Sequence, residues 1–150
     1  MSDQERSAGT HLELLMDMEL ENRQGAGRVI QTQAKIGDYL AGGEGAVFGS
    51  RINGIVRWDL YQEEGEFVCG SNLRGSIKTD DGYQLNFESI GNMVRSDLAQ
   101  PTFWYTTASV SFATDSRPYE WLNKALAVLQ GRYDMGSGRH SYRIFIQVLD

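Results

Sequence analysis

The fold is decided by residues 46–90, which read AVFGSRINGIVRWDLYQEEGEFVCGSNLRGSIKTDDGYQLNFESI. Apolar and polar side chains alternate along this stretch, and Asn53-Gly54, Glu64-Gly65 and Asp81-Gly82 interrupt it. Asn-Gly and Asp-Gly tolerate the positive φ angles of tight turns between antiparallel strands. The pattern therefore predicts a meander of hairpins, with a type I′ turn at Asn53-Gly54.

Both flanks of this meander add strands. Residues 12–20 alternate with a period of two, as in a strand with one buried face, and residues 28–35 follow a Gly-Ala-Gly turn as a second strand. Residues 41–49 contain four glycines and indicate a loop or a strongly bent strand. Residues 103–113 and 141–149 have the composition of strands.

One helix is predicted after residue 114. Asp115 or Ser116 can cap it, Pro118 suits its first turn, and Gly131 can end it. Residues 92–101 are mixed in character and indicate a short helix or a lid. The apolar residues at helical spacing are Tyr119, Leu122, Leu126 and Leu129.

These patterns together predict an all-β protein. We expect a single antiparallel β-barrel of about eight or more strands with one packed α-helix. It forms one domain over residues 1–150, in which residues 1–10 are a flexible tail.

The composition argues against several classes of function. The 150 residues carry 14 basic and 20 acidic side chains, a net charge of −6 that argues against nucleic-acid binding. No apolar run approaches the ~20 residues that span a bilayer, and residues 1–10 show no secretory signal, so we expect a cytoplasmic protein without a membrane partner. The single cysteine cannot form a disulfide within the chain, and the two histidines and the cysteine do not have the spacing of a zinc-binding motif. No glycine-rich nucleotide motif is present, so we expect neither a metal nor a cofactor.

Three motifs occur in order along the chain. Arg74 lies five residues before Thr79-Asp80-Asp81-Gly82, and Tyr119-Glu120-Trp121-Leu122-Asn123 follows Phe112-Ala113-Thr114. In this order they resemble the bacterial family called domain of unknown function three-two-three-seven, over the stretch from Arg28 to Val148. The resemblance implies a compact antiparallel β-barrel with one helix. It does not point to any particular activity, because the family has no settled one. The family has a glycine pair and Asp-Trp where this chain has Arg57-Trp58-Asp59.

Alternation places candidate site residues on shared strand faces. Arg57 and Asp59 share one face, opposite Trp58. If Trp58 is interior, Arg57 and Asp59 form a surface pair worth ~0–1 kcal/mol. If the pair points inward, its charges require partners and mark a site.

Further candidates follow from the same reasoning. Asn86 and Glu88 share a face, and a carboxylate at a barrel mouth can have a raised pKa and act as an acid or base. Of Trp104 and Tyr105, one must face the interior, where an aromatic ring gives a cavity a flat apolar wall. His140 is a candidate because imidazole titrates near neutrality.

The function predicted from these features is the binding of a small molecule in the barrel. We favour a cofactor-independent isomerase, cyclase or lyase acting on a small, oxygenated, partly apolar compound; the alternative is a non-catalytic ligand-binding or carrier protein. A homo-oligomer is compatible with the sequence. The predicted catalytic residues are Asp59, Glu88, Arg74 and Tyr105, and the predicted substrate-binding residues are Arg57, Trp58, Asn86, Trp104 and His140.

Overall fold

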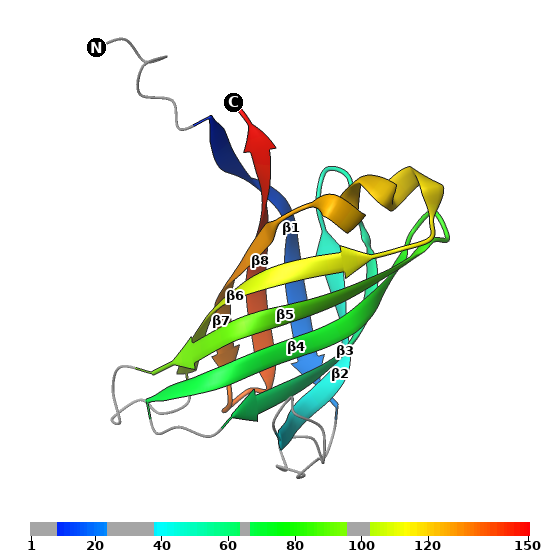
Figure 1. The fold of residues 1–150 in the computed structure, drawn as a ribbon. Helices are drawn as coiled ribbons and strands as arrows, with labels where there is room; N and C mark the ends of the chain where they lie inside the picture. Colours follow the sequence, from blue (N-terminus) through cyan, green and yellow to red (C-terminus); the bar gives the residue numbers. More distant parts are fainter. Residues whose placement is uncertain (1–8, 24–37, 64–66, 96–102) are drawn as a thin grey trace, which may run out of the picture.

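A computed structural model of the chain describes residues 9–23, 38–63, 67–95 and 103–150. Eight antiparallel strands close into a barrel in which each strand pairs with its neighbours in the sequence, and β8 pairs with β1 (Figure 1). The predicted all-β barrel is therefore confirmed. The strands are β1 Thr10–Asn22, β2 Asp38–Phe48, β3 Gly54–Glu63, β4 Val68–Thr79, β5 Gln84–Val94, β6 Phe103–Ala113, β7 Ala127–Asp134 and β8 Arg139–Leu149.

The strand alternation decides which side chains form the core. In β3, Val56, Trp58 and Leu60 are buried, whereas the side chains of Arg57 and Asp59 are 80% and 51% exposed. The same alternation runs through β5 and β6. Because successive side chains of a strand point to opposite faces, the apolar set of each strand lies inside the barrel.

The seam between β1 and β8 closes the sheet. The two strands pair from Thr10 with Leu149 to Glu21 with Arg139, with a shift in register between Leu14 and Met16. By contrast, β1 pairs with β2 only from Asp17 to Asn22. The first half of β1 is therefore held mainly by β8.

The connection after β6 differs from the sequence prediction. A 3₁₀ helix, η2, covers Arg117–Lys124, and Ala127–Asp134 form strand β7, which includes residues 127–130 of the predicted α-helix. Leu129 is buried within that strand, and Gly131 lies in its middle instead of ending a helix. The reason is tertiary: residues 127–134 pair with both β6 and β8, and without them the barrel cannot close.

The two glycine turns also behave differently. Gly82 has a φ of 92°, and its N–H donates to the carbonyl of Thr79 at 2.9 Å, which confirms a tight turn there. The type I′ turn predicted at Asn53-Gly54 is wrong, because Gly54 begins β3 and residues 49–53 form the connection. The Asn53 side chain bonds both the N–H and the carbonyl of Gly49 across this loop.

For the remaining segments, the prediction can be compared with the structure only where the residues are described. Residues 41–48 belong to β2, so the bent strand rather than the loop is present, and residues 92–94 end β5. The predicted strand over 28–35, the turn before it, the turn at Glu64-Gly65 and most of the segment 92–101 lie outside the described residues.

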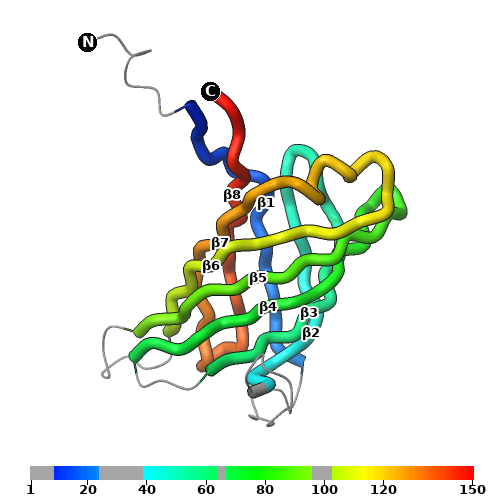
Figure 2. The backbone as a smooth tube through the Cα atoms, in the orientation of Figure 1, coloured from blue at the N-terminus to red at the C-terminus, as the bar shows by residue number. Residues whose placement is uncertain are grey.

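The two ends of the barrel are unlike each other (Figure 2). Helix η2, the start of β1 and the end of β8 lie at one end, which we call the η2 end. Strands β1, β3, β5 and β7 end at the opposite end, which we call the Asn22 end. None of the described helical residues forms a segment long and apolar enough to cross a membrane.

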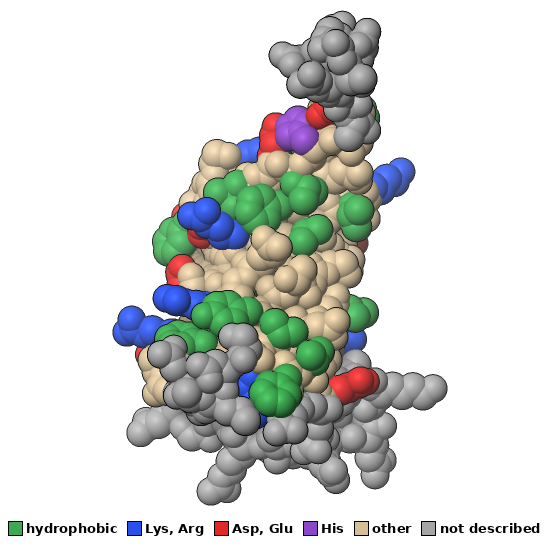
Figure 3. Space-filling model, turned by 90° about the vertical axis from the view of Figure 1, so that its left-hand side faces the viewer, with side chains coloured by type: hydrophobic (Ala, Val, Ile, Leu, Met, Phe, Trp, Pro, Cys, Tyr) green, Lys and Arg blue, Asp and Glu red, His purple; other side chains and the backbone are tan. Residues whose placement is uncertain are grey.

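Apolar side chains are also exposed on the outer surface. On the face shown in Figure 3, they form two groups separated by a band of uncharged side chains and backbone. The most exposed large apolar residues of the described chain include Leu12, Phe48, Ile55, Ile90 and Leu149.

Candidate functional site

A polar cluster occupies the barrel interior near the Asn22 end. His140 is the second residue of β8, Asn22 is the last of β1, and Tyr133 of β7 pairs with His140. Trp58 reaches the same place from β3. We call these four residues and Tyr142 the His140 cluster. Trp58, Tyr133, His140 and Tyr142 are each no more than 2% exposed.

Aromatic rings confine the imidazole of His140. The ring of Tyr133 stacks on it with a centroid distance of 3.9 Å and an angle of 3° between the ring planes. The indole of Trp58 meets it edge to face at 4.6 Å. His140 therefore has little freedom to rotate, and its nitrogen atoms have fixed directions.

A continuous run of hydrogen bonds joins the polar atoms of the cluster. His140 Nε2 lies 2.8 Å from Asn22 Oδ1, and His140 Nδ1 lies 3.0 Å from the Tyr142 hydroxyl. The amide nitrogen of Asn22 donates to the Tyr133 hydroxyl oxygen at 3.0 Å. These bonds offset the cost of placing polar groups in an apolar interior.

The cluster is uncharged at neutral pH. Burial lowers the pKa of His140 to about 3, because an imidazolium would lose its hydration there. Burial also raises the pKa of Tyr142. The site therefore presents neutral hydrogen-bonding groups and flat apolar rings rather than a charge.

Two glycines flank Trp58 in the wall, and one of them makes room for Phe87. Gly43 of β2 and Gly75 of β4 are the partners of Trp58 in the neighbouring strands. A Cβ atom at Gly75 would lie 2.8 Å from Cζ of Phe87, so the aromatic ring occupies the space that a side chain would need. The indole N–H of Trp58 donates to the carbonyl of Glu44 at 3.2 Å, which holds the ring in place.

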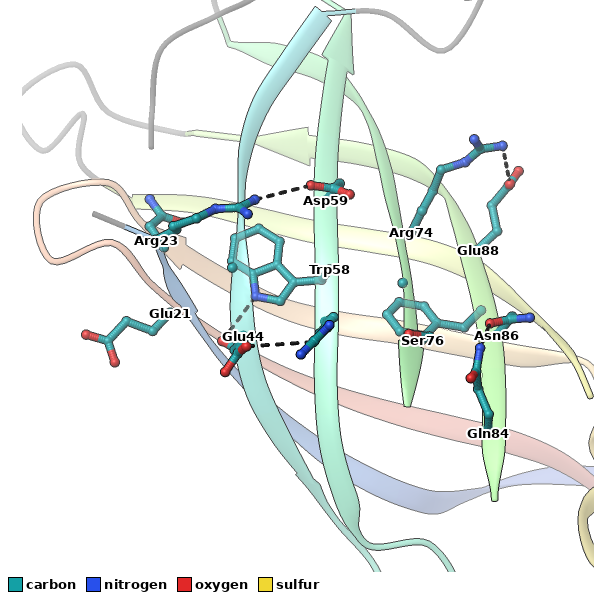
Figure 4. A pocket seen from close by; sticks show the side chains of 15 residues that line it. Glu21, Arg23, Glu44, Trp58, Asp59, Arg74, Ser76, Gln84, Asn86 and Glu88 are labelled. Atoms are coloured by element: carbon teal, nitrogen blue, oxygen red, sulfur yellow. Dashed lines mark hydrogen bonds and ion pairs between the residues drawn. The ribbon is translucent and has the colours of Figure 1, made fainter. Parts of the chain in front are cut away.

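The predicted charged residues lie on the other side of the wall. A depression of about 970 Å³ at β2–β5 is lined by the exposed side chains of Arg57, Asp59, Arg74 and Glu88 (Figure 4). Asn22 and Trp58 of the His140 cluster also line it. Since Trp58 is interior, the surface alternative for Arg57 and Asp59 is the one that the structure adopts.

Each of these charges has a partner on the surface. Arg74 forms an ion pair with Glu88, and their side chains are 43% and 38% exposed. Asp59 lies 3.7 Å from Arg23, and Arg57 lies 3.7 Å from Glu44. Exposed pairs of this kind contribute about 0–1 kcal/mol each.

The structure thus divides the predicted site residues into two groups. It brings Arg57, Asp59, Arg74, Asn86 and Glu88 together in the outer depression, where Gln84 donates to Asn86 at 3.3 Å. Trp58, Trp104 and His140 are buried inside the barrel, and Trp58 also borders this depression.

Trp104 and Tyr105 point to opposite faces of β6, as predicted. Trp104 is buried, and its indole nitrogen lies 3.1 Å from the sulfur of Met135. Tyr105 is 49% exposed and lines a second outer depression, of about 930 Å³, over β6, β7, β8 and β1. Tyr105 thus points to the outer face, and Tyr142 of the His140 cluster lines the same depression.

Sequence reasoning missed Asn22, Tyr133 and Tyr142. The spacing of His140 and Tyr142, two residues apart on the face shared with Ile144, is a signal that identifies Tyr142 as interior. Asn22 and Tyr133 carry no such signal, because they approach His140 only when β1 and β7 pair with β8.

Metal binding finds no support in the described part of the chain. Its histidine, cysteine, aspartate and glutamate side chains form no group of three or more that could hold an ion. The prediction that the protein needs no metal or cofactor remains a prediction.

Comparisons with known proteins identify the fold. No protein-family model and no curated protein matches the chain. A β-barrel-like protein from Acinetobacter baumannii AYE is 20% identical with a TM-score of 0.75, and the match covers 95% of this chain and 98% of that one. A protein of unknown function from Clostridium acetobutylicum is 16% identical with a TM-score of 0.72, over 93% and 99% of the two chains.

A fungal protein has a more distant likeness. The structure of an enzyme from Penicillium herquei is 19% identical with a TM-score of 0.56, over 93% of this chain and 97% of that one. At these identities the likeness is one of fold. The bacterial relatives are consistent with a small family of uncharacterised β-barrels, and the specific family that the sequence resembles stays a prediction.

Proposed function

We propose that the protein binds a small, oxygenated, partly apolar molecule at the His140 cluster. The observation that carries this proposal is a hydrogen-bonded group of neutral polar side chains among aromatic rings, inside a barrel at the end opposite η2. Ligand sites in proteins are mostly apolar concave regions with a few placed polar groups, and small barrels hold ligands near their mouths.

The chemistry of the cluster selects the kind of ligand. Described interior residues near His140 supply hydroxyl, amide and imidazole groups without a charge, which suits a carbonyl, hydroxyl or enol oxygen better than a phosphate. The flat rings of Trp58 and Tyr133 suit an unsaturated or aromatic skeleton.

Conversion of the ligand is the second candidate function. An isomerase, cyclase or lyase acting on such a compound must stabilise charge that develops on an oxygen atom, and preorganised donors do this in a water-poor site. The connected hydrogen bonds of Tyr142, His140 and Asn22 favour this candidate. A carrier would use the same contacts without a chemical step.

Titration of the ¹⁵N-labelled protein with a set of aryl ketones and phenols tests the binding proposal. We expect chemical-shift changes at Tyr133 and His140, which do not line the outer depression, and none at Arg74 or Glu88, which do. Trp58→Leu should weaken binding about tenfold or more, because a large aromatic contact is lost. The matched control is Trp121→Leu in η2, at the opposite end. Shifts confined to Arg74 and Glu88 would move the site to the outer face.

Exchange of the α proton of a bound ketone distinguishes the two candidate functions, enzyme and carrier. A ketone that binds is incubated with the protein in D₂O, and deuteration of its α carbon is followed by NMR. Exchange faster than in buffer, and slowed in His140→Gln, supports the enzyme. Binding without faster exchange supports the carrier for that class of ligand.

A further inference from the structure

The hydrogen bonds of the His140 cluster have a direction. Asn22 Oδ1 can only accept, so the neutral imidazole must carry its proton on Nε2 and donate it to Asn22. His140 Nδ1 is then an acceptor, and the Tyr142 hydroxyl donates to it. The Asn22 amide group donates in turn to the oxygen of Tyr133.

The run of donors ends at Tyr133. Its hydroxyl oxygen accepts from Asn22, and no hydrogen bond in which it donates is formed with another described residue. Its aromatic ring is held by stacking on His140. The Tyr133 hydroxyl proton therefore has no acceptor among the described residues, and it is polarised by the hydrogen bond that the Tyr133 oxygen accepts.

We propose that Tyr133 donates this hydrogen bond to a carbonyl or enolate oxygen of the ligand, with Asn22 and His140 as positioning residues. The inference rests on the proposed function and names the substrate class: compounds with a conjugated carbonyl group beside an apolar ring. A carbonyl oxygen has no proton of its own, so it complements a lone donor such as the Tyr133 hydroxyl.

The tautomer of His140 provides a test without a ligand. Nitrogen chemical shifts of ¹⁵N-histidine-labelled protein at pH 7 should show the proton on Nε2 of His140. His11→Gln removes the signal of the other histidine and so assigns the spectrum. A proton on Nδ1 would mean that the run of hydrogen bonds is reversed and uses the Tyr133 proton itself, which overturns the inference.

Two probes of nearly equal shape test the donor itself. Acetophenone carries a carbonyl group where α-methylstyrene carries a methylene group. Tyr133→Phe should weaken acetophenone binding about 5- to 10-fold and leave α-methylstyrene unchanged, as expected for one neutral hydrogen bond. The carbonyl stretch of bound ¹³C-acetophenone should be lower in the wild type than in this variant. Tyr105→Phe, on the outer face, should change neither.

Asn22→Asp tests whether Asn22 directs the Tyr133 proton toward the ligand, without changing the packing around Tyr133. The aspartate has the same shape but only acceptor atoms, so it would take the Tyr133 proton while Tyr133 remains in place. The shift of the carbonyl stretch should then disappear in a folded protein.

The outcomes distinguish the two proposals. If acetophenone binds the wild type but Tyr133→Phe changes neither its affinity nor its stretch, the inference about Tyr133 fails and the binding site stands. If neither probe binds the wild type and the wider titration is also without effect, both fail. Should Tyr133→Phe not fold, the tautomer of wild-type His140 decides.

Discussion

At the scale of the residue, burial changes what a side chain can do. His140 lies between the faces of Tyr133 and Trp58, and burial lowers its pKa to about 3. His11, on the surface, bonds Asp150 and Glu13, and its pKa is raised by these two hydrogen bonds. The two histidines are therefore in opposite protonation states near pH 6, and only the buried one is a neutral donor and acceptor.

The depressed pKa of His140 predicts a loss of stability in mild acid. Between pH 6.5 and about 3 the unfolded state binds a proton that the folded state does not, so stability rises with pH in this window and is lost as pH falls. The slope should approach about 1.4 kcal/mol per pH unit. Urea unfolding at several pH values measures it.

Two variants control this pH experiment. In His140→Gln the contribution of His140 to the slope should vanish. In His11→Gln the contribution of His140 to the slope should remain. The raised pKa of His11 gives this residue a contribution to the slope of the opposite sign. An equal slope in the wild type and His140→Gln would contradict the burial argument.

The outer ion pairs should matter little to binding. Glu88→Gln breaks the pair with Arg74 on the surface, and we expect a change in unfolding free energy below about 1 kcal/mol. Since the proposed ligand lies on the inner side of the wall, its affinity should not change. Calorimetric titration of a bound aryl ketone checks this, and a large loss would return Glu88 to the role predicted from the sequence.

At the scale of the element, β2–β5 form a wall in which glycines lie beside inner aromatic rings. Glycines stand where inner rings need room, and Gly75 lies between Trp58 and Phe87 in the sheet. Helix η2 is fastened to the β4–β5 turn, since the Tyr119 hydroxyl donates to the carboxylate of Asp81 at 2.9 Å. The strands thus shape the site, and η2 covers the far end.

Gly75→Ala should destabilise the barrel. The added Cβ would lie 2.3 Å from the carbonyl oxygen of Arg57 and 2.8 Å from the ring of Phe87, and backbone cannot move away cheaply. We expect a loss of about 1–3 kcal/mol in denaturant unfolding. Ser76→Ala, on the outer face of the same strand, should cost less than about 0.5 kcal/mol. Equal effects would mean that the inner wall can relax.

At the scale of the whole molecule, closure removes the exposed edges of the sheet. The β1–β8 seam joins the two ends of the described chain and places Asn22 beside His140. Exposed apolar groups remain on the outer surface (Figure 3), and the association of copies through them stays a prediction. Sedimentation measures that association directly.

Closure predicts that the seam is as stable as the middle of the sheet. Amide protons of Asp17–Glu21 at the seam should exchange with solvent only on global unfolding, at the same free energy as those in β4 and β5. Hydrogen exchange followed by NMR measures both, with the turn at Asp81-Gly82 as the fast-exchanging control. Faster exchange at the seam would show that the barrel opens there.

The sequence alone determined the class of fold and which side chains of each central strand share a face. Period-two alternation in residues 55–61 and 83–90 and the glycine turn at Asp81-Gly82 are local signals, and the strands formed where they predicted. The helical prediction is wrong for residues 127–130 because Leu122, Leu126 and Leu129 also fit helical spacing. Only pairing with β6 and β8 decides that these residues form a strand.

Tertiary structure alone decided which groups meet. Arg57 and Asp59 could have faced either way until the burial of Trp58 set the inner side, because alternation identifies two faces without saying which is enclosed. Asn22 and His140 are 118 residues apart, and their contact exists only because the seam brings the end of β1 to the start of β8. Long-range closure is not encoded in any local pattern, and the candidate site is made from it.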